Sequence, residues 1–230
     1  MEEPVRKILR ARSRLSRVLK WFRSCAVCGS FRPPIDLLCE SCGEDLERVR
    51  NRGGALLQPG YPFPVFSLFT WDEQTAPLVK PLLYAFKGGR SVEWGSRLAG
   101  SLLYERGLSG GQAPIFVHPP SSGGKPDHAW LLAHTLAMAW REPNAPVLAL
   151  EKSDRGGKQK QRSVSERATR RFHARGKASF SDSVAPRVFV DDVITSGATA
   201  MAAYMALGDP ARFEVWTLAC RPKLAGAKGF

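Results

Sequence analysis

Residues 188–200 constrain the fold of this chain more than any other stretch. Residues 188–190 are apolar and partly β-branched, which is typical of a short strand buried on both faces of a sheet. The run stops at two adjacent carboxylates, Asp191 and Asp192, and a turn of small residues follows. An alanine-rich helix is then predicted over 201–207. This order indicates one unit of an open α/β sheet, in which ligands bind beyond the carboxyl ends of the strands.

The chemistry of this unit suggests a ligand class. Five consecutive residues form the turn: Thr195, Ser196, Gly197, Ala198 and Thr199. Their backbone N–H groups, together with the helix dipole, favour a bound phosphate. Ionised carboxylates accept hydrogen bonds and do not donate them, so Asp191 and Asp192 suit hydroxyl groups of the same ligand. A ligand that carries a phosphate beside a diol is a ribose 5-phosphate. The alternative interpretation is that residues 188–192 are a buried strand that ends in two acidic residues by chance.

Four cysteines near the N-terminus predict a second site. They form two Cys-x-x-Cys pairs with ten residues between the pairs: Cys25, Cys28, Cys39 and Cys42. This spacing brings four thiolates within reach of one tetrahedral zinc, with no open coordination position, so the zinc is expected to be structural. Gly29 and Gly43 follow the second cysteine of each pair and suit a tight turn with positive φ. Reactive dithiols or free cysteines are the alternatives.

Composition limits the classes that remain. The formal net charge is +13, from 34 Lys and Arg against 21 Asp and Glu, which favours polyanionic partners or phosphate-rich substrates. No apolar run is long enough for a transmembrane helix, and the basic N-terminus lacks the apolar core of a secretory signal. Without a secretory signal we expect a cytoplasmic protein, in which five cysteines argue against a disulfide framework. Cys220, in a late apolar strand, is expected to lie in the core.

The order of the elements predicts the fold class. Apolar and basic residues alternate with helical period over 4–23, which indicates either a helix docked on its own domain or one that binds nucleic acid or a membrane surface. Residues 51–64 are rich in Gly and Pro and indicate a linker. Strands are predicted over 65–71, 115–117, 146–150, 188–190 and 213–218, and helices over 77–86, 94–103 and 129–140. Strands that alternate with helices predict an α/β fold with a mostly parallel sheet.

Two further segments are expected to face the ligand. The Pro/Gly-rich loop after the second strand suits close approach to an anion, although a plain surface turn is the alternative; its residues are Ser121, Ser122, Gly123, Gly124 and Lys125. Lys87 ends the first helix of the sheet domain. Residues 152–177 hold ten Lys or Arg and two acids, which indicates either a solvated face or cations that stabilise a leaving group.

Residues 188–200 resemble the phosphoribosyl-pyrophosphate (PRPP) motif of type I phosphoribosyltransferases. Residues 161–172, in which Gln161, Ser165, Arg167 and Phe172 stand at the characteristic positions, resemble a segment of the ComF family. That family joins an N-terminal four-cysteine zinc module to a phosphoribosyltransferase domain, and the resemblance covers roughly residues 25–223. With the basic amphipathic helix indicated by the N-terminal pattern, the predicted domains are that helix over 1–24, a zinc-binding module over 25–50 and a phosphoribosyltransferase-like domain over 60–230.

The resemblance also implies a function. It implies binding of PRPP with Mg²⁺, possible transfer of the phosphoribosyl group to an unknown acceptor, and a role in DNA uptake and natural transformation, with single-stranded DNA or DNA-processing proteins as partners. Asp191 and Asp192 would contact the ribose, and Lys158 and Arg162 would stabilise the departing pyrophosphate with the loop over 121–125 and Lys87. One departure is that residues 123–128 replace the Arg-Gly-Phe-Asn-Gln-like segment of the family. The alternative is a non-catalytic, zinc-containing DNA-associated adaptor or PRPP sensor.

Overall fold

The computed structural model describes most of the predicted α/β core. The described residues are 24–30, 38–51, 61–87, 92–106, 113–120, 127–140, 145–152, 172–174, 185–208 and 210–221. Three predictions lie outside them: the helix over 4–23, the loop over 121–125, and the basic segment that contains Lys158 and Arg162. Within the described part of the chain, no helix combines the length and apolar character needed to span a membrane.

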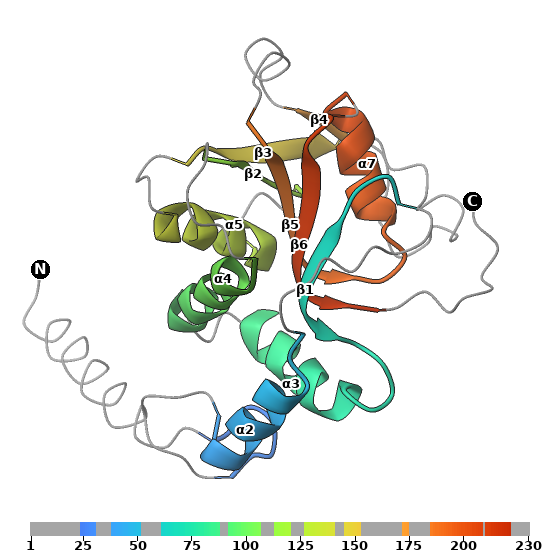
Figure 1. Ribbon diagram of the computed structural model, residues 1–230. Helices are drawn as coiled ribbons and strands as arrows, with labels where there is room; N and C mark the ends of the chain where they lie inside the picture. Colours follow the sequence, from blue (N-terminus) through green and yellow to red (C-terminus); the bar gives the residue numbers. More distant parts are fainter. Residues whose placement is uncertain are drawn as a thin grey trace, which may run out of the picture.

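A six-stranded sheet forms the centre of the molecule (Figure 1). Its strands, in chain order, are β1 (Val65–Thr70), β2 (Ile115–His118), β3 (Val147–Lys152), β4 (Phe172–Ala174), β5 (Arg187–Ile194) and β6 (Phe213–Cys220). Their order across the sheet is β1-β6-β5-β2-β3-β4, and every neighbouring pair is parallel except β3 and β4. The predicted mostly parallel sheet is therefore confirmed, with one short antiparallel strand at its edge.

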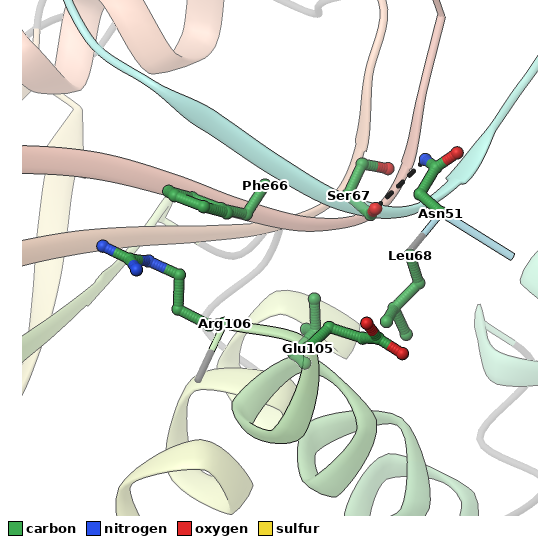
Figure 2. A pocket seen from close by; sticks show the side chains of 7 residues that line it. Asn51, Phe66, Ser67, Leu68, Glu105 and Arg106 are labelled. Carbon is green, nitrogen blue, oxygen red and sulfur yellow. Dashed lines mark hydrogen bonds between the residues drawn. The ribbon is translucent and has the colours of Figure 1, made fainter. Parts of the chain in front are cut away.

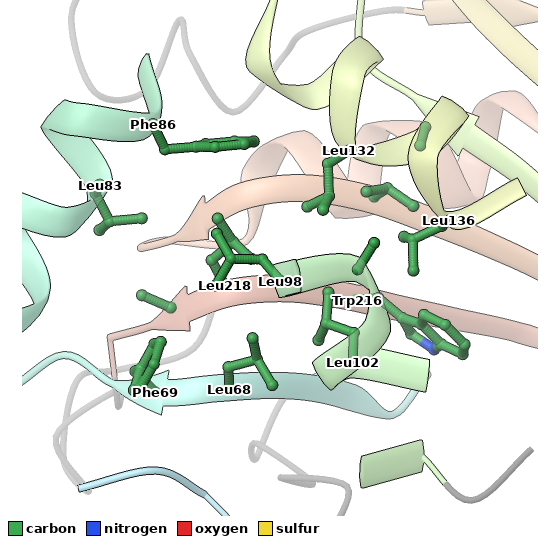
Figure 3. Close-up of a cluster of buried hydrophobic side chains, with 14 of the residues drawn as sticks. Leu68, Phe69, Leu83, Phe86, Leu98, Leu102, Leu132, Leu136, Trp216 and Leu218 are labelled. Atoms are coloured by element: carbon green, nitrogen blue, oxygen red, sulfur yellow. The ribbon is translucent and has the colours of Figure 1, made fainter. Parts of the chain in front are cut away.

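Helices cover both faces of the sheet, as Figure 1 shows. Helices α3 (Ala76–Lys87), α4 (Val92–Arg106) and α5 (His128–Ala139) lie on one face, and α7 (Ala198–Ala206) lies on the other. Figure 3 shows the larger core, in which leucines of the three helices pack on Phe69, Trp216 and Leu218 of the sheet. The second core packs α7 against the opposite face, with Phe189 buried between layers. Burial on both faces explains why the central strands are rich in apolar residues.

The structure corrects the predicted end of the central strand. The sequence suggests that the strand ends before the acidic pair, but β5 continues through both carboxylates to Ile194. Asp191 pairs with Thr217 and Val193 with Ala219, so the parallel ladder to β6 is unbroken there. The two carboxylates are thus fixed by strand backbone and not by a flexible turn.

A short segment joins the cysteine-containing region to the sheet. Helix α2 (Glu40–Arg48) buries Leu46 in the core beside α3, and the chain then runs antiparallel to β1, the edge strand. The Asn51 amide nitrogen donates to the Leu68 carbonyl at 2.8 Å, and its side chain donates to the Ser67 carbonyl at 3.1 Å (Figure 2). Asn51, the first residue of the predicted linker, is therefore fixed to the sheet.

Candidate functional site

The four cysteines lie together, as their spacing predicts. Their sulfur atoms all lie within 4.8 Å of one another. The Sγ atoms of Cys28 and Cys39 are 3.7 Å apart, and a tetrahedral zinc with Zn–S bonds of about 2.3 Å requires about 3.8 Å between its sulfurs. The thiols belong to residues 25–30 on one side and to the start of α2 on the other. The donor set and its spacing fit a closed structural zinc site.

The two halves of this cluster differ in backbone and in acidity. Gly29 has a φ of +74°, as predicted, but Gly43 lies inside α2, so the prediction of positive φ there is wrong. Hydrogen bonds from Ser30 lower the pKa of the exposed Cys28 thiol to about 6, whereas burial raises the pKa of Cys42. Cys28 is therefore the thiol most readily present as the thiolate that binds metal.

The acidic pair on β5 lies at the centre of a second cluster. Asp192 is 4% exposed, and its Oδ2 lies 2.6 Å from Lys87 Nζ, while its Oδ1 lies 3.3 Å from His128 Nε2. Asp191 is half-buried, and its Oδ1 accepts the Asp192 backbone N–H at 2.9 Å. This hydrogen bond folds the Asp191 carboxylate back along the strand, so the two side chains come close although neighbouring strand residues point to opposite faces.

Topology explains why these residues meet. β5 lies between β6 and β2, so the segments that follow β2 reach it directly. His128 is the first residue of α5, whose N-cap Asp127 accepts the Trp130 N–H at 3.0 Å, and Lys87 is the last residue of α3. On the other side, the buried hydroxyl of Thr217 donates to the Asp192 carbonyl at 2.9 Å. Two helix ends and two strands therefore fix the geometry of the cluster.

The pKa values within the cluster are strongly shifted. Burial, together with the charge of Asp192, raises the pKa of Asp191 to about 8. Burial also opposes ionisation of Asp192, but its contacts with His128 and Lys87 outweigh that effect and lower its pKa. The hydrogen bond to Asp192 in turn raises the pKa of His128. The cluster therefore holds one stable carboxylate and a second one that ionises near neutral pH.

The turn after β5 contains a left-handed glycine at the start of α7. Gly197 has a φ of +72° and caps α7, and the first intrahelical bond runs from the Met201 N–H to the Gly197 carbonyl. The amides of residues 198–200 precede that bond, at the helix start where phosphate-binding amides lie, and that of Ala198 donates to Ser196 Oγ at 3.4 Å. Tyr61 contacts one side of the turn: its hydroxyl donates to the Ser196 carbonyl, and its ring lies where a Cβ on Gly197 would be.

The structure brings only part of the predicted site together. The residues of the turn, the acidic pair and Lys87 lie at one edge of the sheet, while the predicted pyrophosphate loop, Lys158 and Arg162 are outside the described residues. Sequence reasoning did not assign a role to His128 or Tyr61. The sequence does contain an indication for His128: it stands at a predicted helix start, after Asp127 and the Gly/Pro-rich loop that follows β2. Because β2 is the neighbour of β5, a residue at that helix start lies close to the acidic pair. The sequence contains no such indication for Tyr61, since it lies in the predicted linker.

Replacement of Asp191 by asparagine is expected to change how stability depends on pH. The fold raises the pKa of Asp191 from its ordinary 3.8 to about 8, so its stabilising protonated form is lost as the pH rises through that interval. Asp191→Asn removes this loss and keeps an acceptor for the Asp192 N–H. The variant should unfold at a higher temperature than the wild type at about pH 9 and at a similar one at about pH 4.

Thermal unfolding in metal-free and PRPP-free buffer measures this difference, and each kcal/mol corresponds to about 2–4 °C for a chain of this size. Unfolding temperatures that differ by the same amount at every pH would contradict the assignment of the shift to Asp191.

Comparisons with known proteins give only distant likenesses. No family model and no curated protein matches the chain. Adenine phosphoribosyltransferase from Saccharomyces cerevisiae is similar at 15% identity and TM-score 0.34, over 79% of this chain and 89% of that one. Hypoxanthine phosphoribosyl transferase from Trypanosoma cruzi is similar at 16% identity and TM-score 0.34, over 61% and 76%. A glutamic acid mutant at an invariant aspartic acid in HPRTs is similar at 15% identity and TM-score 0.31, over 61% and 79%. Likenesses at this level establish neither a family nor a substrate for this chain.

Proposed function

We propose that this chain is a ComF-like protein that binds PRPP with Mg²⁺ at the carboxyl edge of its sheet and transfers the phosphoribosyl group to an acceptor. One observation carries the proposal. On the central strand β5, a pair of carboxylates leads directly into a turn with a left-handed glycine and then into the start of α7. Acceptors for a diol and donors for a phosphate thus follow one another along a single rigid unit.

Each part of the unit has a proposed role. The backbone amides of the turn over 195–199 hold the 5-phosphate, and Asp191 accepts hydrogen bonds from the ribose hydroxyls together with Asp192. Lys87, whose Nζ lies 2.6 Å from Asp192 Oδ2, supplies a positive charge to the incoming pyrophosphate. The resemblance to ComF proteins supports the same role for Lys158, Arg162 and the loop over 121–125.

The proposed reaction is a substitution at C1 of the ribose. The bond between C1 and the pyrophosphate oxygen breaks, the pyrophosphate leaves with the electron pair, and a nucleophile forms a new bond to C1. Mg²⁺ supplies charge neutralisation on the pyrophosphate when it is bound with PRPP. Preorganised cations around the leaving group make the largest contribution to such a step.

A second candidate function is a PRPP sensor or DNA-associated adaptor without catalysis. Two contacts favour it: Asp192 is engaged by Lys87 and His128, and Tyr61 holds the Ser196 carbonyl of the turn. A ligand that needs these partners displaced binds with an affinity reduced by the fraction of molecules in which they are displaced. The net charge of +13 supports a nucleic-acid partner, and with it the proposed role in DNA uptake, for either function.

Titration of the full chain with PRPP and Mg²⁺ in a calorimeter tests the shared part of both functions. Saturable binding is expected, and Asp191→Asn should weaken it about tenfold or more, which corresponds to about 1.4 kcal/mol. The neutral side chain keeps its shape but binds hydroxyl groups less strongly than a carboxylate does. Glu44→Gln, an equal change of charge at an exposed position of α2, is the matched control and should bind as the wild type does.

Two outcomes separate the alternatives. Release of pyrophosphate with any member of a panel of bases and amines identifies the transferase. PRPP binding with no release across the panel identifies the sensor, and a complete absence of PRPP binding contradicts both.

A further inference from the structure

Three metal-binding side chains meet at the edge of the sheet, apart from the four cysteines. His128, Asp191 and Asp192 each offer a ligand atom, and these atoms all lie within 4.8 Å of one another. The carboxylates come from β5 and the imidazole from the start of α5, so separate elements of the rigid fold hold them. A site built from a strand and a helix end does not depend on a loop to become ordered.

The oxygen atoms of Asp192 are not fully satisfied. Its side chain is 6% exposed, and among the described residues no donor reaches Oδ2 with hydrogen-bond geometry. Lys87 Nζ lies 2.6 Å from this oxygen, so the contact is an ion pair with poor angles and not a hydrogen bond. The Lys87 side chain is itself 41% exposed, which leaves it free to turn toward solvent. A buried carboxylate oxygen held only in this way is open to a better cation.

We propose that His128, Asp191 and Asp192 form a binding site for a divalent transition-metal ion, of which Mn²⁺ is the representative, and that the ion replaces the Lys87 ammonium at Asp192. When both are ionised, the two carboxylates carry two negative charges, of which the Lys87 ammonium balances one. A divalent ion balances both carboxylates from a single position and also gains the imidazole nitrogen as a ligand.

The donor set decides which ion fits. Mg²⁺ prefers oxygen ligands and an octahedral shell, whereas an imidazole with two carboxylates suits Mn²⁺ and its neighbours in the series. Zn²⁺ is drawn first to the four thiolates, which are softer ligands. The two sites are therefore expected to load with different metals.

This site shares Asp191 and Asp192 with the proposed PRPP site, but it does not depend on PRPP binding. Its ligands all come from the chain, so the ion is expected to bind before any nucleotide. Where PRPP does bind, a metal on the two carboxylates would lie next to the ribose hydroxyls.

Electron paramagnetic resonance of free Mn²⁺ tests the proposal. The full chain is first loaded with one equivalent of zinc, which fills the four-cysteine site, and is then titrated with Mn²⁺ in the absence of PRPP. The signal of free Mn²⁺ should fall with a stoichiometry of about one ion per chain. His128→Gln should weaken binding about tenfold or more, because it removes the nitrogen ligand. His134→Gln is the matched control: His134 lies on the same helix, stacked on Trp130, and its replacement should leave Mn²⁺ binding unchanged.

A second variant guards against loss of folding. Lys87→Met removes the competing ammonium and should bind Mn²⁺ about tenfold more tightly than the wild type, a gain that a misfolded chain does not show. Absence of Mn²⁺ binding, or equal binding by His128→Gln and the wild type, overturns the proposal. If PRPP with Mg²⁺ still binds in that case, the proposed function survives alone; if Mn²⁺ binds and PRPP does not, the metal site survives alone.

Discussion

Replacement of Cys42 by serine is expected to abolish zinc binding and to unfold the N-terminal cysteine module. Cys42 is 7% exposed and is one of four sulfurs that lie within 4.8 Å of one another. Apparent binding free energies of structural zinc are about 10–16 kcal/mol in isolated peptides, and the loss of one thiolate removes most of that contribution. Because Leu46 of α2 packs in the main core beside α3, the unfolding temperature of the whole chain should fall as well.

Metal content and thermal unfolding measure the two effects. Cys220→Ser is the matched control, because Cys220 is fully buried in β6 and belongs to no cysteine cluster among the described residues. It should lower stability through the packing it disturbs, yet it should retain one zinc per chain. A Cys42→Ser protein that still holds a full equivalent of zinc would show that the four thiols do not act as one site.

Replacement of Gly197 by alanine is expected to be the most damaging single change at the turn. A φ of +72° is left-handed, and a residue with a Cβ pays about 1–2 kcal/mol to adopt it. The added carbon would also overlap the hydroxyl and ring of Tyr61, which donates to the Ser196 carbonyl. The variant should lose thermal stability and any affinity of the turn for phosphate, because Tyr61 or the turn must move.

A double substitution separates the two causes. Tyr61→Ala alone should lower the unfolding temperature moderately, since it removes the stacking of the ring on Phe63, with a centroid distance of 5.4 Å. In the Tyr61→Ala background, Gly197→Ala should still lose the stability that the left-handed φ requires, but not the stability lost through overlap with the ring. The loss of stability in the double variant should therefore be smaller than the sum of the two single losses. Equal effects of Gly197→Ala with and without Tyr61 would contradict the contact.

The elements of the sheet were predictable because each one satisfies a local rule. The apolar run over 188–190 marks β5, β6 is mostly apolar, and the amphipathic pattern of α3 marks its buried side. β4 and α2 were not predicted. β4 has only three residues and pairs with β3 alone. Most residues of α2 are polar, so its two buried residues, Cys42 and Leu46, do not form a recognisable apolar pattern.

The site was predictable where one segment contains it and unpredictable where distant segments meet. The four cysteines lie within one short segment of the chain, and the acidic pair and the turn of the β5–α7 unit are nearly adjacent in the sequence. His128 and Lys87 reach Asp192 only because α5 and α3 end beside the same strand, and Tyr61 reaches the turn from 135 residues away in the chain. Contacts of this kind depend on topology, which local sequence patterns do not specify.

The segment at Arg50 and Asn51 also protects the sheet from other chains. β1 has β6 on one side and, on the other, the bridge between Arg50 and Phe69 and the Asn51 hydrogen bonds. An uncovered outer strand offers its unpaired amides and carbonyls to any extended peptide, and so promotes self-association. The residues that connect the cysteine-containing region to the sheet therefore protect this edge strand from aggregation, and a domain expressed from residue 60 onward would lack that protection.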